Sequence, residues 1–150
     1  MESRLPRGRP SLMSGFVIGE NLMFFWQRRT WMTLAAIGGF VAVAMGAFAA
    51  HGVSDPRAAE LLKTGASYGF MHCLATLACA TFMQVGARGA RHAPAFFLSG
   101  VLLFSGSLYA LAFGAPRWMG LVTPVGGLLF LSGWAVLAWA AQDVDRTSDS

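Results

Sequence analysis

Four long apolar stretches, separated by short polar links, dominate the chain. They run from about 31 to 50, 66 to 87, 93 to 115 and 121 to 141, and none of them contains Asp, Glu, Lys or Arg. Each is close to the ~20 residues that a helix needs to cross a hydrocarbon layer of ~30 Å. The stretches are apolar throughout and lack the alternation of a transmembrane β-strand. The pattern therefore predicts an all-α membrane protein, a bundle of four transmembrane helices joined by short loops.

The link between the first two stretches carries a helix-start signal. Asp55 can accept hydrogen bonds from exposed backbone N–H groups as an N-cap, and Pro56 needs no N–H donor at the first helical position. We expect residues 57 to 64 to form a short periplasmic interfacial helix, after which Gly65 lets the chain turn into the second span.

The segments outside the four stretches are expected to lie in the cytoplasm. Residues 1–30 form an N-terminal extension in which 16–26 can fold as an interfacial helix, and 142–150 form a tail. Arg28 and Arg29, the apolar run after them and the triplet at 47–49 also permit a signal-peptide interpretation, although the run exceeds the usual 7 to 15 residues. Met13, Met23 and Met32 are alternative starting points for translation.

Composition supports a membrane protein of a single domain. The chain has 150 residues, of which 55% are hydrophobic and 12% charged, whereas soluble domains carry about 25% charged residues. A soluble domain of this size would leave about 30% of its unfolded surface in water, so it could not hide so much apolar surface. The two cysteines, Cys73 and Cys79, fit neither a disulfide framework nor a structural zinc site.

The distribution of positive charge predicts the orientation in the membrane. Eight of the eleven basic residues lie in the N-terminal extension, the link between spans two and three, and the C-terminal tail; the other three are Arg57, Lys63 and Arg117. The positive-inside rule places both termini in the cytoplasm of an inner-membrane protein. Basic residues in tails and loops suit a lipid bilayer better than a nucleic acid, so we expect the bilayer, a second copy or a larger membrane assembly as partners.

Small residues at four-residue spacing are expected to let the helices approach closely, because helices in lipid associate through packing. The candidates for this role are Gly38, Ala42, Gly46, Ala50, Gly65, Gly69, Gly106, Ala110, Gly114, Gly126, Gly127 and Gly133.

Polar residues in the outer halves of the spans form a candidate cluster. Its members are His51, Tyr68, His72, Ser105, Ser107, Tyr109 and Thr123. His72 lies roughly 9 Å below the outer boundary at a rise of about 1.5 Å per residue. Our main interpretation is a neutral imidazole hydrogen-bonded to a Tyr or Ser hydroxyl. A proton or small-molecule site, or ligation of a metal or haem, are the alternatives.

Catalytic signatures of soluble enzymes are missing from the sequence: it has no G-x-S-x-G, H-E-x-x-H, P-loop or G-x-G-x-x-G motif. We therefore expect no enzyme activity, no cofactor and no metal. The favoured function is a structural or accessory membrane component. A small permease or channel-like protein using the polar cluster is the second hypothesis, and a haem- or metal-binding protein the third.

Four ordered motifs resemble one family. They are GAFAAHG at 46–52, Tyr68 with His72, LFSGSLYAL at 103–111 and TPVGGLLFLSGW at 123–134. Together they resemble the YgdD-like family of small inner-membrane proteins, a domain-of-unknown-function family with eukaryotic relatives. The resemblance covers about 34 to 139 and implies a four-helix membrane protein without an established activity. The extension of about thirty residues departs from the family's usual form.

Overall fold

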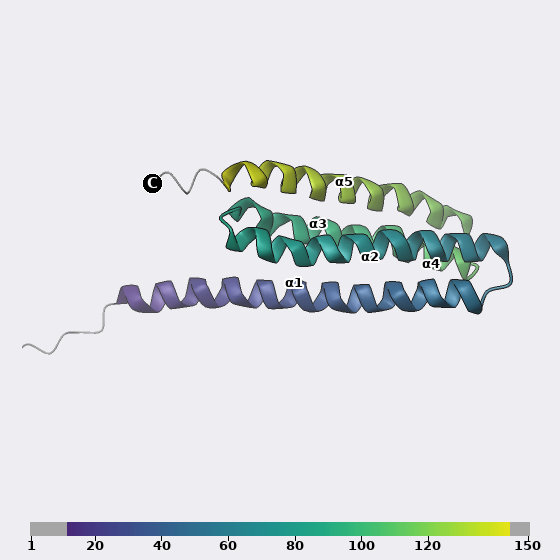
Figure 1. Cartoon of the computed structure of the whole chain (residues 1–150), viewed down its shortest axis with the longest axis horizontal. Helices are drawn as coiled ribbons and strands as arrows, with labels where there is room; N and C mark the ends of the chain where they lie inside the picture. The colour runs from purple at the N-terminus through teal and green to yellow at the C-terminus, as the bar shows by residue number, and fades with distance from the viewer. Residues whose placement is uncertain (1–11, 145–150) are drawn as a thin grey trace, which may run out of the picture.

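The computed structural model describes residues 12–144, and it is helical throughout apart from short links. Successive helical segments run antiparallel, as Figure 1 shows. Within residues 12–144, four helices are long and apolar enough to cross a membrane: Arg28–His51, Pro56–Gln84, Arg88–Ala112 and Arg117–Ala140. The prediction of an all-α membrane protein with four membrane-length helices is thus confirmed.

The first two segments are single α-helices, α1 (Leu12–His51) and α2 (Pro56–Gln84). The third is composite. It consists of the 3-10 turn η1 (Arg88–His92), α3 (Ala93–Gly100), the π-helical turn η2 (Val101–Ser105) and α4 (Gly106–Ala112). The fourth consists of η3 (Arg117–Leu121), α5 (Val122–Ala140) and the final turn η4 (Ala141–Asp143).

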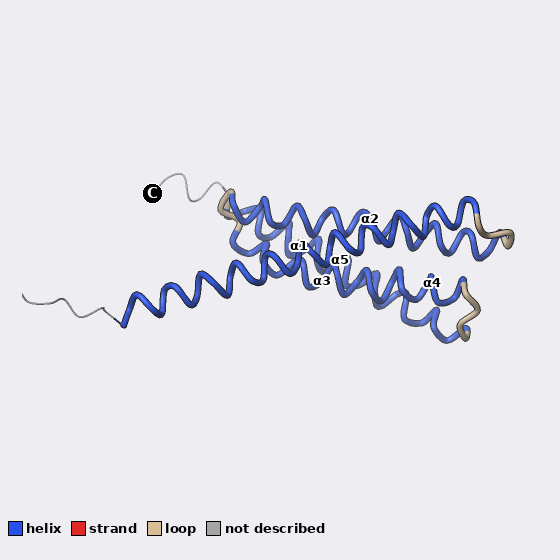
Figure 2. Tube along the Cα trace, turned by 90° about the horizontal axis from the view of Figure 1, so that it is seen from below, coloured by secondary structure: helices blue, strands red, loops and turns tan. Residues whose placement is uncertain are grey.

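The third segment is central, because it contacts both α2 and α5 along its length. Helix α1 packs mainly on α2, at the flank of the molecule. Figure 2 shows that α1 crosses the other segments obliquely and diverges from α2 toward its N-terminal end. The bundle is therefore three packed segments with α1 attached to one of them.

Helix α2 begins where the sequence predicts. The Asp55 carboxylate accepts hydrogen bonds from the backbone N–H groups of Arg57 and Ala58, at 3.3 and 3.1 Å. The separate interfacial helix expected at 57–64 does not form, because α2 continues unbroken through Gly65. Gly65 is buried within α2, and a Cβ there would lie 2.7 Å from Cε1 of Tyr109. Because Gly65 has no side chain, Tyr109 can pack against α2 at this position, and the helix continues without a turn.

Helix α1 is also longer than expected. The backbone is α-helical without interruption from Leu12 into the first span, so residues 16–26 belong to α1 instead of forming a separate surface helix. In Figure 1 this part of α1 extends beyond the ends of the other helices. The basic residues at positions 4, 7, 9 and 146 lie outside the described residues.

Two glycines end helices in a conformation that other residues avoid. Gly86 follows α2 with φ of 101°, and Gly114 follows α4 with φ of 90°. Backbone bonds from Ala87 N–H to Phe82 O and from Ala115 N–H to Ala110 O close these turns at 3.1 and 2.9 Å. A left-handed residue after the last helical turn satisfies carbonyls that lack a helical partner. Gly114 thus ends a segment, whereas the sequence suggested that it packs against a helix.

Close packing of α2 on α1 uses several of the expected small residues. A Cβ on Gly38 would lie 2.7 Å from Sγ of Cys73, and one on Gly46 would lie 3.6 Å from Cβ of Ala66. Ala42 is buried, but Ala50 is exposed and Ala49 is buried in its place. The fully buried positions Ala35, Ala42 and Ala49 follow a spacing of seven, as in left-handed helix pairs. The expected spacing of four holds for Gly38, Ala42 and Gly46 and fails at Ala50.

The third and fourth segments approach most closely at two glycines of α5. A Cβ on Gly126 would lie 2.4 Å from the backbone nitrogen of Phe104, and one on Gly133 would lie 2.5 Å from Cε1 of Phe97. Gly127 has more room, with Phe104 Cδ2 at 4.0 Å. Gly106 differs from expectation, since a Cβ added to it would meet nothing within 4 Å, and Ala110 is half-buried.

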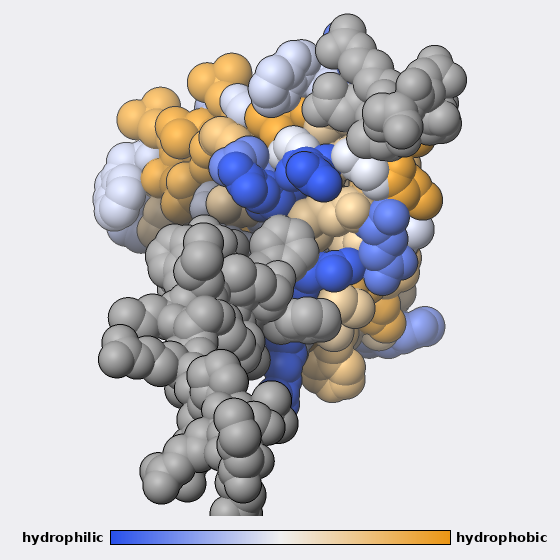
Figure 3. All heavy atoms as spheres, turned by 90° about the vertical axis from the view of Figure 1, so that its left-hand side faces the viewer, coloured by the Kyte–Doolittle hydropathy of each residue, from blue (hydrophilic) through white to orange (hydrophobic). Residues whose placement is uncertain are grey.

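The two ends of the bundle differ in charge. Arg28 and Arg29 of α1 lie at the same end as Arg88 and Arg91 of η1, because successive segments are antiparallel. Figure 3 looks onto this end and shows hydrophilic side chains gathered over the helix ends, with hydrophobic ones around them. Arg57 and Arg117, in contrast, lie at the starts of α2 and η3, at the opposite end.

Candidate functional site

His72 lies inside the bundle on α2, with 6% of its surface exposed. Its Nδ1 lies 2.7 Å from the carbonyl oxygen of Tyr68, one turn earlier. The indole Nε1–H of Trp134, on α5, donates a hydrogen bond of 3.2 Å to Nε2 of His72. Since an indole nitrogen can only donate, Nε2 must accept and the ring proton must lie on Nδ1. Both ring nitrogens of the neutral imidazole are thereby satisfied within the chain.

Aromatic rings surround the imidazole. Phe130 stacks on it with ring centroids 3.5 Å apart and planes 9° apart. Trp134 meets it edge-on with centroids at 6.2 Å, and Phe97 is tilted at 5.6 Å. Tyr68 contributes a more distant parallel ring at 6.3 Å. We call His72, Phe97, Phe130 and Trp134 the His72 cage; it leaves only 6% of the histidine surface exposed.

Ser105 joins the third segment to α2. Its Oγ–H donates to the carbonyl oxygen of Gly65 at 2.7 Å, across 40 residues of sequence. Ser105 is the last residue of the π-helical turn η2, and a Cβ on Gly69 would lie 2.9 Å from its Oγ. The missing side chains of Gly65 and Gly69 therefore make room for the serine to reach the backbone of α2.

Ser107 joins the third segment to α5. Its Oγ lies 2.7 Å from Oγ1 of Thr123 and 2.9 Å from the carbonyl oxygen of Phe104. Either hydroxyl can donate in the first contact. If Ser107 donates to its own helix, Thr123 donates to Ser107, and both hydroxyls are satisfied without a third partner.

Among the residues that the structure describes, three members of the predicted cluster make no side-chain hydrogen bond to the other members. His51 is exposed at the end of α1. Tyr68 is 44% exposed and contacts Phe104 and His72 through its ring. The Tyr109 hydroxyl oxygen is buried and has no hydrogen-bond partner among the described residues. The predicted single cluster is thus three separate sites, at His72, Ser105 and Ser107.

The His72 site differs from the predicted one in its partner. The sequence suggested a Tyr or Ser hydroxyl, whereas the partner is the Trp134 indole. Phe130 and Trp134 were not assigned to the site, although their spacing of four places both on one face of a helix. Gly126 precedes Phe130 by four on the same face and lets α5 approach the third segment. The four-residue spacing of Gly126, Phe130 and Trp134 was the sequence signal from which Phe130 and Trp134 could have been assigned to the site.

Metal ligation at His72 would require breaking the bond from Trp134, because Nε2 is already occupied. Within residues 12–144, no three His, Cys, Asp or Glu side chains gather as metal ligands would. Cys73 and Cys79 are both buried and free. The Cys79 thiol donates to the carbonyl oxygen of Ala75 at 3.1 Å, as a buried packing residue does.

Comparison with known proteins matches the chain to one family model and to several membrane proteins. Residues 45–127 match the family model described as "Protein of unknown function (DUF423)". The chain is 44% identical over 117 residues to a UPF0382 membrane protein of Haemophilus influenzae, a match that covers 76% of this chain and 94% of the relative. It is 44% identical over 122 residues to the UPF0382 inner membrane protein YgdD of Escherichia coli strain K12, covering 79% and 93%.

More distant relatives include a UPF0382 membrane protein of Staphylococcus epidermidis, 33% identical over 115 residues, covering 75% of this chain and 94% of the relative. No solved structure is significantly similar to the chain. The family description names no reaction. Membership therefore defines the class of protein, and the role of the His72 cage has to be inferred from its geometry. The helices and the relatives together identify the chain as an integral inner-membrane protein, and it belongs to the DUF423 family.

Proposed function

We propose that the protein is a structural or accessory component of the inner membrane, and that its intramembrane polar residues serve to align the helices. The observation that carries this proposal is the saturation of His72: its two ring nitrogens have partners on α2 and α5. Ser105 and the pair Ser107 and Thr123 add two further hydrogen bonds between segments. Polar groups that satisfy one another fix the alignment of helices whose apolar faces could otherwise slide.

The permease hypothesis has weaker support. A solute or proton site needs a polar group that can exchange its partner for a ligand. His72 would have to release the Trp134 indole, and the stacked Phe130 ring covers one face of the imidazole at 3.5 Å. Those contacts favour a permanent structural role over a transport site.

The proposed orientation has both termini in the cytoplasm. Arg28, Arg29, Arg88 and Arg91 lie at one end of the bundle, and the positive-inside rule assigns that end to the cytoplasm. Arg57 and Arg117 then lie at the periplasmic end, together with the Asp55 cap of α2. Partners of such a component are the bilayer itself and other membrane chains, including a second copy, because large apolar side chains of α1 such as Phe40 remain exposed.

Proteoliposomes provide the test. The purified chain and its His72→Ala variant are reconstituted into vesicles that contain a pH-sensitive dye, and proton entry is measured after an acid jump. Glycerol entry is measured in parallel by light scattering. We expect both proteins to match empty vesicles, while His72→Ala unfolds at a lower denaturant concentration. Faster entry with the wild-type chain that His72→Ala abolishes would overturn the proposal in favour of a permease.

A further inference from the structure

A groove of about 270 Å³ lies at the end of the bundle that carries Asp55. It is formed between the start of α2 and the end of α4, beside the first residue of η3. Three membrane-length helices begin or end next to it, at Pro56, Ala112 and Arg117. The groove therefore lies at the level where the polar headgroups of a bilayer meet its hydrocarbon layer.

The lining of this groove, which we call the Asp55 groove, is charged on one side and apolar on the other. Its charged members are Asp55, Arg57 and Arg117, and its large apolar members are Leu61 and Leu111. Leu61 lies one helical turn further into the bundle than Arg57, and Leu111 lies inside the end of α4. The apolar side thus leads into the bundle, as the glycerol end of a phospholipid requires.

Both arginines of the Asp55 groove are available to a ligand. Arg57 stands in the first turn of α2 and Arg117 at the start of η3, on two separate walls. Both are exposed, and neither guanidinium forms a hydrogen bond or an ion pair with another residue of the range 12–144. Guanidinium groups form charge-assisted hydrogen bonds with phosphate. The groove therefore offers a phosphate two donor groups that the rest of the described chain leaves unused.

Asp55 adds an acceptor to the same groove. Its two carboxylate oxygens each accept one hydrogen bond, from the backbone N–H of Arg57 at 3.3 Å and from that of Ala58 at 3.1 Å. An ionised carboxylate has about four lone-pair sites, so both oxygens can accept a further donor. A primary ammonium group supplies such donors, whereas a trimethylated one supplies none.

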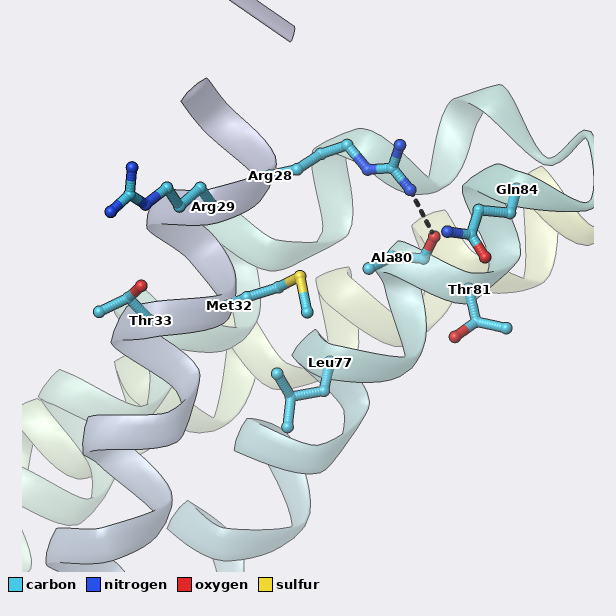
Figure 4. A pocket seen from close by; sticks show the side chains of 8 residues that line it. All are labelled: Arg28, Arg29, Met32, Thr33, Leu77, Ala80, Thr81 and Gln84. Atoms are coloured by element: carbon cyan, nitrogen blue, oxygen red, sulfur yellow. Dashed lines mark hydrogen bonds between the residues drawn. The ribbon is translucent and has the colours of Figure 1, made fainter. Parts of the chain in front are cut away.

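The larger groove at the opposite end, of about 510 Å³ between α1 and α2, lacks this combination. Arg28 donates a hydrogen bond of 3.2 Å to the carbonyl oxygen of Ala80 there, and Figure 4 shows Arg29 pointing the other way. No acidic side chain is among the described residues that line it. It is thus in the smaller Asp55 groove that cations and a carboxylate lie together.

We infer that the Asp55 groove binds one phospholipid whose headgroup carries both a phosphate and a primary ammonium group, as in phosphatidylethanolamine. The phosphate lies between Arg57 and Arg117, the ammonium group donates to Asp55, and the glycerol end rests on Leu61 and Leu111. A headgroup with a negative charge alone would leave the Asp55 carboxylate without a cation. The inference rests on the groove's place at the helix ends, and not on which side of the membrane that end faces.

Native mass spectrometry of the full chain in detergent tests the inference. The protein is titrated with phosphatidylethanolamine and with phosphatidylcholine of the same acyl chains. We expect one phosphatidylethanolamine per chain, bound about three- to fivefold more tightly than phosphatidylcholine, the factor that an ion pair between exposed groups provides. Equal binding of the two lipids by the wild-type chain would refute the inference.

Asp55→Asn is the sharpest variant, because asparagine caps a helix as well as aspartate does but has no charge to attract an ammonium group. We expect this variant to bind the two lipids equally and to keep the helical circular dichroism of the wild type. An unchanged preference for phosphatidylethanolamine in Asp55→Asn would contradict the inference.

The arginines are tested one charge at a time. Arg57→Gln and Arg117→Gln should each weaken the binding of both lipids about threefold, since both lipids carry the phosphate. Lys63→Gln removes one charge from an exposed position of α2 outside the groove and should leave binding unchanged. An equal loss in all three variants would mean that net charge alone attracts the lipid, which would refute the site.

The apolar side has its own test. Ala112→Trp places a ring in the groove from the last residue of α4, and Leu121→Trp adds the same ring at a position that is 76% exposed and outside the groove. We expect only Ala112→Trp to weaken phosphatidylethanolamine binding, by severalfold. Binding unaffected by Ala112→Trp, or displacement of the lipid by millimolar phosphoethanolamine, would contradict a site for the whole lipid. Equal helical circular dichroism confirms that the variants are folded.

Discussion

The indole nitrogen of Trp134 and Nε2 of His72 lie 3.2 Å apart, although 62 residues separate them in the sequence. The bond connects α5 directly to α2, two segments that otherwise contact one another mainly through the central third segment. It also fixes the imidazole tautomer, since the remaining nitrogen faces the carbonyl oxygen of Tyr68. One side-chain pair therefore joins α5 to α2 and sets the tautomer of the intramembrane histidine.

Replacing Trp134 by Phe should keep the aromatic packing and remove the donor. We expect Trp134→Phe to lower the free energy of unfolding in detergent by about 0.6 kcal/mol and by no more than about 1.7 kcal/mol, the range measured for hydrogen bonds in membrane proteins. A double-mutant cycle with His72→Phe isolates the bond, because each single variant removes the same interaction.

The control for this cycle is Trp139→Phe. Trp139 lies on the same helix but is 66% exposed, so its replacement should not couple to His72→Phe. If the coupling energy between Trp134→Phe and His72→Phe is zero, as it is expected to be between Trp139→Phe and His72→Phe, the bond contributes nothing to stability.

Adjacent glycines of α5 should respond in opposite ways to the same methyl group. A Cβ on Gly126 would lie 2.4 Å from the backbone nitrogen of Phe104, which cannot move without displacing the third segment. We expect Gly126→Ala to destabilise the fold by roughly 1–3 kcal/mol, as overpacking does. Gly127→Ala meets Phe104 Cδ2 only at 4.0 Å, so the better helix propensity of alanine should leave stability unchanged or raise it by up to about 1 kcal/mol.

Chemical unfolding followed by circular dichroism measures both glycine variants under one condition. Equal midpoints for Gly126→Ala and Gly127→Ala would mean that α5 is not pressed against the third segment at this position.

The Tyr109 hydroxyl should be dispensable for folding. Its oxygen is buried and lacks a hydrogen-bond partner among residues 12–144, and an unsatisfied buried polar group costs about 1–3 kcal/mol. We therefore expect Tyr109→Phe to leave stability unchanged or to raise it, and thermal unfolding in detergent is the measurement. Tyr68→Phe, at a more exposed ring, is the matched control and should change little. A loss above about 1 kcal/mol for Tyr109→Phe alone would show that the hydroxyl has a partner.

The four membrane-length helices followed from the sequence because an apolar run of about twenty residues is a strong and local signal. The start of α2 was equally local, since Asp55 and Pro56 act on their own helix. The prediction of a separate interfacial helix at 57–64 was wrong because it required Gly65 to make a turn. Gly65 remains helical because its missing side chain receives Tyr109 from another segment, and sequence position alone carries no information about that neighbour.

The site was harder to predict than the fold. The estimated depth in the membrane singled out His72, but the identity of its partner depends on the rotation of α5 about its axis. That rotation is set by the close approach of Gly126 and Gly133 to the third segment. A histidine in lipid needs a partner of some kind, and nothing in its own helix distinguishes the Trp134 indole from a hydroxyl.

The orientation should be readable from two single cysteines. Cys73 and Cys79 are buried, and replacing both by Ala gives a background for Ser54→Cys, in the link before α2, and His92→Cys, at the end of η1; both positions are exposed. With the arginine-rich end in the cytoplasm, a membrane-impermeant maleimide added to whole Gram-negative cells should label Ser54→Cys and leave His92→Cys unlabelled until the cells are lysed. The reverse pattern would place both termini in the periplasm, and labelling of both sites before lysis would mean that one link lies outside the predicted topology.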